Sequence, residues 1–252
     1  MIKVLITGGG GYVGSMVSTK LVNLGYKVTV LDLMIYGEEV LKKNKNLKII
    51  KGDIRDLNLL KKEIPGHEVL IHLACISNDP SFELNPKLGK SINLDAFEPL
   101  VEVSKNSLIK RFIYASSSSV YGLKKEKEIH EDIVLEPLTD YSKYKVECEQ
   151  ILKTYKTDQF TPIIIRPATV CGYSPRQRLD VVVNILTNLG YHNRKISVFG
   201  GMQLRPNIHI KDMVEAYDVL INAEKSKISG ETFNAGYENK SVLDLANTVK
   251  NV

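Results

Sequence analysis

The sequence predicts an α/β protein that has a doubly wound parallel sheet followed by a smaller C-terminal lobe. Through about residue 166, short β-branched segments alternate with longer helical segments. This alternation is typical of parallel sheets with helices on both faces. Beyond residue 166, long polar loops replace the regular alternation. We therefore expect one domain over residues 1–166 and a lobe over residues 167–252 that is partly interleaved with the core.

The expected strands are runs of mostly β-branched or apolar residues, suited to burial on both faces of a sheet. They lie at Ile2–Thr7, Lys27–Asp32, Leu47–Lys51, Glu68–Leu73, Lys110–Ala115 and Thr161–Arg166. The expected helices carry apolar residues three and four positions apart. They lie at Tyr12–Leu24, Asp56–Glu63, Pro86–Asn106 and Ser142–Tyr155, and in the lobe near Val181–Leu189, Asp212–Ala223 and from Ser241. Pro99 should kink or break the third helix, because proline lacks an amide donor.

The composition excludes several classes of protein. Of the 252 residues, 43% are hydrophobic and 25% charged, as in ordinary soluble domains. The net charge of +5 comes mostly from dispersed lysines, which indicates a solvated surface rather than a nucleic-acid face. The three cysteines lack the paired spacing of disulfides or zinc sites, and the longest apolar run is too short to span a bilayer. We expect a cytoplasmic protein that binds neither metal, nucleic acid nor membrane.

A glycine-rich segment, TGGGGYVG at residues 7–14, lies between the first strand and the first helix. Glycine at three positions lets the chain turn tightly, approach a pyrophosphate and pack the helix against the strand. The helix N-terminus then offers free amides and a positive dipole end to that phosphate. The pattern predicts a Rossmann-type dinucleotide site that includes Gly8, Gly11, Tyr12, Val13 and Gly14.

Asp32 ends the second strand, where its carboxylate can accept hydrogen bonds from both hydroxyls of an adenosine ribose. The same carboxylate would repel a 2′-phosphate, and residues 33–36 supply no cation to neutralise one. The sequence therefore predicts NAD rather than NADP as the cofactor.

A tyrosine and a lysine four residues apart open the helix after the fifth strand. Tyr141 and Lys145 share one helical face, where an ammonium group can favour the phenolate. A tyrosine with a lowered pKa can take a proton from a sugar hydroxyl while a hydride leaves the same carbon. The serines at 116–119 follow the fifth strand, and a serine hydroxyl beside the tyrosine could bond to the same oxygen. Together with the glycine turn, these residues predict a redox site.

These motifs follow one another along the chain in a fixed order: TGGGGYVG, GDIRD, IHLACIS, YASSSSVYG, YSKYK, RPATVCG and RPNIHIKDM. The chain thereby resembles the extended short-chain dehydrogenase/reductase superfamily, within its NAD-dependent nucleotide-sugar epimerase/dehydratase group. The resemblance implies that Ser117, Tyr141 and Lys145 are catalytic, with Ser116 and Ser118 as near alternatives to Ser117. It also implies that the cofactor is contacted by Lys145, Asp53, Ile54, Leu73, Ala74 and Pro167. A homodimer is expected on the same basis.

Within this group, the residues after the catalytic serine help to separate the reactions. The 4,6-dehydratases carry Asp-Glu there, whereas this chain has Ser118 and Ser119, which supply no carboxylate. We therefore expect a nucleotide-sugar 4-epimerase that works through a 4-keto intermediate. A C4 dehydrogenase or reductase remains open, as does a 3,5-epimerase that would use Cys75 or His72. A non-catalytic NAD-binding sensor is disfavoured, because Tyr141 and the lysine are both kept.

Arginines in the second half of the chain suggest where a nucleoside-diphosphate sugar binds. The planar guanidinium suits a diphosphate. By resemblance, Arg205 contacts the diphosphate of the substrate, Arg178 is a second candidate, and Asn184 contacts the substrate less securely. Members of the group are usually longer than this chain, which is then either a compact version or a truncated fragment of a longer enzyme.

Overall fold

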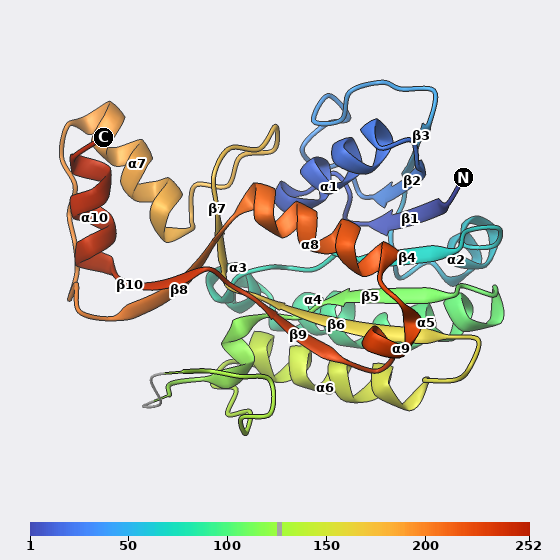
Figure 1. The fold of residues 1–252 in the computed structure, drawn as a ribbon. Helices are drawn as coiled ribbons and strands as arrows, with labels where there is room; N and C mark the ends of the chain where they lie inside the picture. Colours follow the sequence, from blue (N-terminus) through green and yellow to red (C-terminus); the bar gives the residue numbers. More distant parts are fainter. Residues whose placement is uncertain (125–127) are drawn as a thin grey trace.

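The computed structural model describes residues 1–124 and 128–252. Within this part of the chain, the main sheet has seven strands in the order β3-β2-β1-β4-β5-β6-β9, all paired in parallel (Figure 1). They are β1 (Lys3–Thr7), β2 (Lys27–Asp32), β3 (Leu47–Lys51), β4 (Val69–His72), β5 (Arg111–Ala115), β6 (Thr161–Pro167) and β9 (Thr232–Ala235). The order reverses between β1 and β4, so the binding crevice is expected at the carboxyl ends of these strands.

Helices cover both faces of this sheet. One face packs against α1 (Tyr12–Asn23) and α8 (Ile210–Asn222), and the other packs against α2 (Leu57–Glu63), α5 (Phe97–Asn106) and α6 (Asp140–Thr154) (Figure 1). Successive strand residues therefore enter different cores: Val4 belongs to the first and Leu5 to the second, and both are fully buried. The doubly wound α/β fold is confirmed, and the six expected strands end within one residue of their predicted positions.

The single helix expected over 86–106 is wrong, because the structure divides it into three segments. These are α4 (Pro86–Lys90), the π-helical turn η1 (Ser91–Asp95) and α5. The break lies before Pro99, which falls in the first turn of α5, where a missing amide donor costs little because the first amides of a helix have no partner within it. A short helix, α3 (Asp79–Leu84), precedes these segments.

The chain beyond residue 166 contributes to both parts of the molecule. It forms a second sheet, β10-β8-β7, in which β8 (Leu204–His209) pairs antiparallel with β10 (Glu238–Ser241) and parallel with β7 (Thr169–Cys171). The helices α7 (Val182–Asn193) and α10 (Val242–Lys250) share a small apolar cluster in this lobe. In contrast, α8 and β9, joined by the short helix α9 (Lys225–Ile228), return to the main sheet (Figure 1).

Candidate active site

The glycine turn connects β1 to α1 and is packed too closely for side chains. Gly8 has a φ of +75°, and a Cβ on it would lie 2.5 Å from the backbone nitrogen of Ala74. A Cβ on Gly14 would collide with the carbonyl oxygen of Gly8. Gly11 is the N-cap residue of α1, whose first turn contains no acidic side chain. The amides of this first turn, which include those of Tyr12 and Val13, are therefore suited to a pyrophosphate.

Asp32 lies directly against this turn. Its Oδ2 accepts a hydrogen bond from the amide of Gly10 at 2.9 Å, and its Oδ1 accepts one from the amide of Met34 at 2.8 Å. The carboxylate thus fixes the glycine turn and the segment after β2 relative to each other. It is only partly buried. The turn, the start of α1 and this carboxylate lie side by side as a dinucleotide requires.

The catalytic candidates are positioned by the end of β5 and the start of α6. Ser117 caps the 3-10 turn η2 (Ser118–Tyr121), and its Oγ accepts a hydrogen bond from the amide of Ser119 at 3.1 Å. A capping box formed by Thr139 and Ser142 starts α6. Tyr141 and Lys145 therefore lie on the first two turns of this helix, facing the end of β5.

The lysine lies between two tyrosine rings. Lys145 Nζ donates to the carbonyl oxygen of Ala115 at 2.7 Å and lies 4.8 Å from the ring centroid of Tyr114 and 5.7 Å from that of Tyr141. Both Lys145 and Tyr141 are nearly fully buried. The structure thus brings together Ser117, Tyr141 and Lys145, which the sequence predicted as a set.

Burial changes the expected electrostatics of this pair. It raises the pKa of Tyr141 above the ordinary tyrosine value, although the Lys145 ammonium and a hydrogen bond with Ser117 both lower it. Burial by itself lowers the pKa of Lys145, but nearby acidic groups, among them Cys75, Tyr141 and Glu149, raise it by a larger amount. The pKa of Lys145 therefore lies above the ordinary lysine value, and the lysine stays protonated. The sequence led us to expect a lowered tyrosine pKa, and for the protein without its cofactor this expectation is wrong. The cost of burying the phenolate outweighs its stabilisation by the Lys145 ammonium.

The other candidate cofactor residues follow or end three strands of the main sheet, β3, β4 and β6. The Asp53 carboxylate accepts hydrogen bonds from Arg55 Nε at 3.0 and 3.1 Å, and this arginine lowers the pKa of Asp53. Ile54 is buried in the core between the sheet and α5. Leu73 and Ala74 follow β4 beside the glycine turn, and Pro167 ends β6 opposite Ala235.

The candidate substrate residues are more widely spread. Arg178 forms an ion pair with Asp180 at 2.8 Å, and its guanidinium lowers the pKa of Tyr141, so it lies on the catalytic side of the loop between β7 and α7. Arg205 is exposed on β8. Asn184 is buried, and its Nδ2 donates to the hydroxyl of Tyr12 at 3.1 Å. In this structure Asn184 therefore joins α7 to α1.

The sequence did not single out Glu149, which contacts the serine segment that carries the candidate Ser117. Its carboxylate accepts a hydrogen bond from Ser116 Oγ and two from Arg166, at 3.0 Å from Nε and 2.7 Å from Nη2. The residue is 2% exposed and Arg166 is 3% exposed. A signal was present, because Glu149 lies four residues after Lys145 and eight after Tyr141, on one helix face.

His72 is a core residue in this structure. Its ring is fully buried at the end of β4, its Nδ1 lies 2.6 Å from the Thr7 hydroxyl, and burial lowers its pKa to about 3. The histidine pKa is higher in the unfolded chain, so folding favours the neutral form of His72. The resulting contribution to the free energy of unfolding is fully present above the unfolded pKa of about 6.5 and is lost as the pH falls toward 3.

We expect the free energy of unfolding to fall by about 2 kcal/mol from His72 alone between about pH 7 and pH 5. Urea unfolding at both pH values measures it. The double variant Thr7→Val/His72→Leu should flatten this dependence, whereas His130→Gln, at an exposed histidine, should leave it unchanged. An equal slope in the double variant and the wild type would contradict the assignment.

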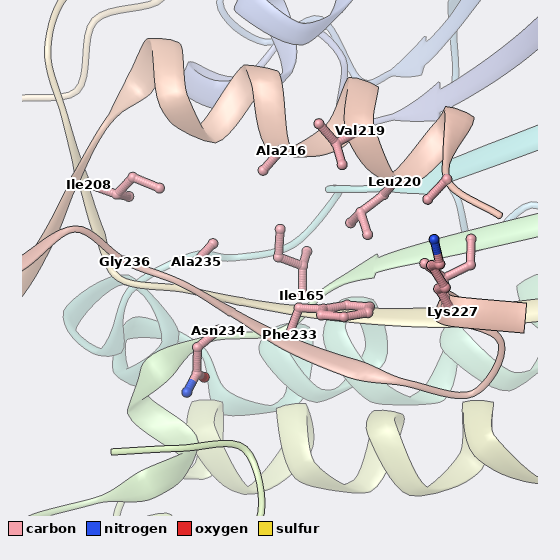
Figure 2. Close-up of a pocket in the computed structure, with 12 residues that line it drawn as sticks. Ile165, Ile208, Ala216, Val219, Leu220, Lys227, Phe233, Asn234, Ala235 and Gly236 are labelled. Carbon is pink, nitrogen blue, oxygen red and sulfur yellow. The ribbon is translucent and has the colours of Figure 1, made fainter. Parts of the chain in front are cut away.

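An apolar cavity of about 420 Å³ lies away from these polar residues, between α8 and the edge strand β9. Figure 2 shows Ala216, Val219 and Leu220 on one side and Ile165 and Phe233 on the other. It holds few polar groups, so it does not resemble a site for a diphosphate. Among the described residues, no group of three His, Cys, Asp or Glu side chains could hold a metal, and no helix is long and apolar enough to cross a membrane.

The fold and this site together define a dinucleotide-dependent enzyme of the short-chain dehydrogenase/reductase class. Residues 4–236 match the family model described as NAD dependent epimerase/dehydratase family, and the chain belongs to that family. The residues present fit NAD, because the glycine turn leaves no room for side chains and Asp32 lies beside it. NAD is therefore the cofactor.

Individual relatives differ in reaction. The chain is 31% identical to an uncharacterized UDP-glucose epimerase of Bacillus subtilis, over 100% of this chain and 82% of the relative. It is 30% identical to a dTDP-D-glucose 4,6-dehydratase of Dictyostelium discoideum, over 99% of this chain but only 62% of the relative. A UDP-glucuronic acid 4-epimerase from Bacillus cereus, in complex with UDP-glucuronic acid and NAD, superposes with a TM-score of 0.89 at 27% identity, covering 99% and 82% of the two chains.

Proposed function

We propose that this protein is a nucleotide-sugar 4-epimerase that oxidises C4 of a nucleoside-diphosphate sugar reversibly. The observation that carries the proposal is the pair Ser118 and Ser119, which occupies the positions where the 4,6-dehydratases of the group carry Asp-Glu. A dehydratase must protonate and deprotonate neighbouring sugar carbons, and a serine hydroxyl is a poor acid and base for that task. An epimerase needs only the Ser-Tyr-Lys set and the cofactor.

In this mechanism, Tyr141 holds and moves the proton of the sugar O4. Ser117 bonds to the same oxygen and orients it toward the tyrosine. Lys145 supplies the positive charge that favours the phenolate. Bound NAD supplies a hydride acceptor and an additional positive charge. Because burial raises the pKa of Tyr141, the lysine and this further charge are both needed to make the tyrosine a useful base near neutral pH.

For the substrate, we propose a UDP-sugar, by analogy with the epimerase relatives from B. subtilis and B. cereus. Arg205 and Arg178 would contact its diphosphate, and Asn184 would support the loop that borders it. Arg178 would have to exchange part of its ion pair with Asp180 for the phosphate. We further propose a division into an NAD-binding domain at 1–166 and a largely substrate-binding lobe at 167–252, and a homodimeric assembly.

The test follows a deuterium label placed at C4 of UDP-glucose or UDP-glucuronic acid. The purified protein, with the NAD it carries, is incubated with each sugar and no other reactant. We expect the C4 epimer to appear with the label retained, since bound NAD would hold the hydride and no hydrogen at C4 would exchange with the solvent. NADH should not accumulate in proportion to product.

Two other outcomes would replace the proposal. Stoichiometric NADH with a product that has lost two hydrogens would make the protein a C4 dehydrogenase. Loss of water from the sugar would make it a dehydratase and overturn the argument from Ser118 and Ser119. A panel of GDP-, CDP- and dTDP-sugars, run in the same way, identifies the nucleotide.

A further inference from the structure

The loop between β7 and α7 is anchored to the first residues of α1. The hydroxyl of Tyr12 donates to the carbonyl oxygen of Gly172 at 2.7 Å, and Ser174 Oγ donates to the carbonyl oxygen of Tyr12, also at 2.7 Å. Ser15 and Ser174 share a further hydrogen bond at 2.9 Å, and both are fully buried. This anchor holds the loop beside the N-terminus of α1, where the pyrophosphate of a dinucleotide binds.

Two residues beyond the anchor, Arg176 reaches the segment that follows β2. Its guanidinium carbon lies 3.8 Å from the ring centroid of Tyr36, which is a stacking distance. Tyr36 belongs to the segment that Asp32 fixes through the amide of Met34. The tyrosine is 52% exposed, so the stack lies at the molecular surface.

Two segments that are held at the glycine turn and the start of α1 therefore meet at Tyr36 and Arg176. One is the loop anchored on Tyr12, and the other is the segment that leaves Asp32. Neither residue has a role in the Ser-Tyr-Lys set, and neither is needed to hold the two segments in place, since each segment has its own buried or backbone hydrogen bonds. The stack adds a direct contact between the two segments.

We propose that the stack of Arg176 on Tyr36 is a closure over the adenosine half of bound NAD, which must open for the cofactor to enter or leave. The inference rests on NAD as the cofactor and not on the reaction at the sugar. An enzyme that returns its hydride to the substrate gains from such a closure, because the cofactor need not leave between turnovers. Since a surface cation–ring contact is weak, the closure would open spontaneously and only slow the exchange.

The test measures exchange of NAD in the whole protein, with no sugar present. Protein loaded with radiolabelled NAD is mixed with excess unlabelled NAD, and loss of label gives the dissociation rate. Protein freed of NAD gives the association rate. We expect Arg176→Ala and Tyr36→Ala each to raise both rates by about three- to tenfold, as the loss of one such contact allows. The double variant should resemble either single variant, because both remove the same contact.

Two further variants separate a closure from a simpler role. Arg176→Lys keeps the charge but loses the planar stack, so it should exchange NAD as fast as Arg176→Ala. Tyr191→Ala removes the ring that lies beneath Arg194, a comparable surface pair at 5.6 Å elsewhere in the lobe, and should leave both rates unchanged. Thermal unfolding of each variant checks that the fold is intact.

Three results would overturn the proposal. A faster dissociation with an unchanged association rate would mean that Arg176 contacts NAD directly. Wild-type rates in Arg176→Lys would mean that its charge, and not the stack, is what matters. Unchanged rates in both alanine variants would make the stack a surface contact only. Because no sugar is added, failure of the epimerase proposal would leave this test unaffected.

Discussion

Replacing Tyr141 with phenylalanine is expected to lower kcat about a thousandfold while leaving the affinity for NAD nearly unchanged. The substitution removes only the phenol oxygen, which in the proposed mechanism takes the proton from the sugar O4 as the phenolate. The ring of Tyr141 is 9% exposed and lies 5.7 Å from Lys145 Nζ, so phenylalanine fills the same space. The packing around the helix α6 and the cofactor crevice should therefore be kept.

Tyr144→Phe is the matched control for this experiment. Tyr144 lies three residues later on the same helix, where its ring packs against Phe82 at 5.7 Å, and removing its hydroxyl should leave kcat close to the wild-type value. Single-turnover reduction of bound NAD by the substrate and titration of NAD binding separate chemistry from cofactor affinity. Retained hydride transfer in Tyr141→Phe would remove this residue from the proton-transfer step.

The pH dependence gives a second readout of the same role. Because the base form of Tyr141 is the phenolate and burial raises the pKa of the phenol, kcat of the wild-type enzyme should rise with pH from the neutral into the alkaline range. The residual activity of Tyr141→Phe should lack this rise. A wild-type rate that falls over the same range would contradict a phenolate base.

The sequence predicted the parallel sheet and the Ser-Tyr-Lys set because both depend on local patterns. Strands are buried on two faces and therefore read as continuous apolar runs, and the spacing from Tyr141 to Lys145 places both on one helix face. The glycine turn could also be predicted from the sequence, because positions such as Gly8 and Gly14 have no room for a side chain and must be glycine.

What the sequence left undetermined depends on contacts between distant segments. Strand β9 joins the main sheet beside β6, from a region of the chain that otherwise builds the lobe. Arg176 meets Tyr36 across 140 positions of sequence. The raised pKa of Tyr141 follows from its burial in the folded chain, which the Tyr-Lys spacing alone could not reveal. The partners of Arg166 could not be predicted for the same reason, because they come from α6 and from the turn that contains Tyr121.

Breaking the ion pair between Glu149 and Arg166 is expected to have the largest effect on stability. Both side chains are almost completely buried, and the arginine also donates to the Tyr121 hydroxyl at 2.8 Å and to the carbonyl oxygen of Glu131 at 3.0 Å. The Tyr121 hydroxyl in turn donates to Asn234 on β9 at 2.7 Å. Figure 2 shows the Asn234 side chain turned away from the apolar groups of the cavity. One network thus joins α6, β6 and β9.

Glu149→Gln keeps the shape of the side chain but leaves the guanidinium of Arg166 buried without its counter-charge. Removal of one partner from a buried pair costs about 3–5 kcal/mol, so the midpoint of thermal unfolding should fall by about 10 °C. Glu224→Gln is the control. Its ion pair with Lys227, at 3.2 Å, is more than two-thirds exposed and should be worth less than about 1 kcal/mol.

A second variant separates the cost of the unpaired buried charge from the cost of the lost hydrogen bonds. In Glu149→Gln/Arg166→Met no unpaired charge remains, so a large part of the lost stability should return, although Tyr121 and Ser116 still lose partners. Urea unfolding of the three variants measures these differences. Equal stability of Glu149→Gln and Glu224→Gln would show that the buried pair contributes nothing. A recovery in the double variant without recovery of kcat would show that Glu149 also positions the segment at Ser116 and Ser117 for catalysis.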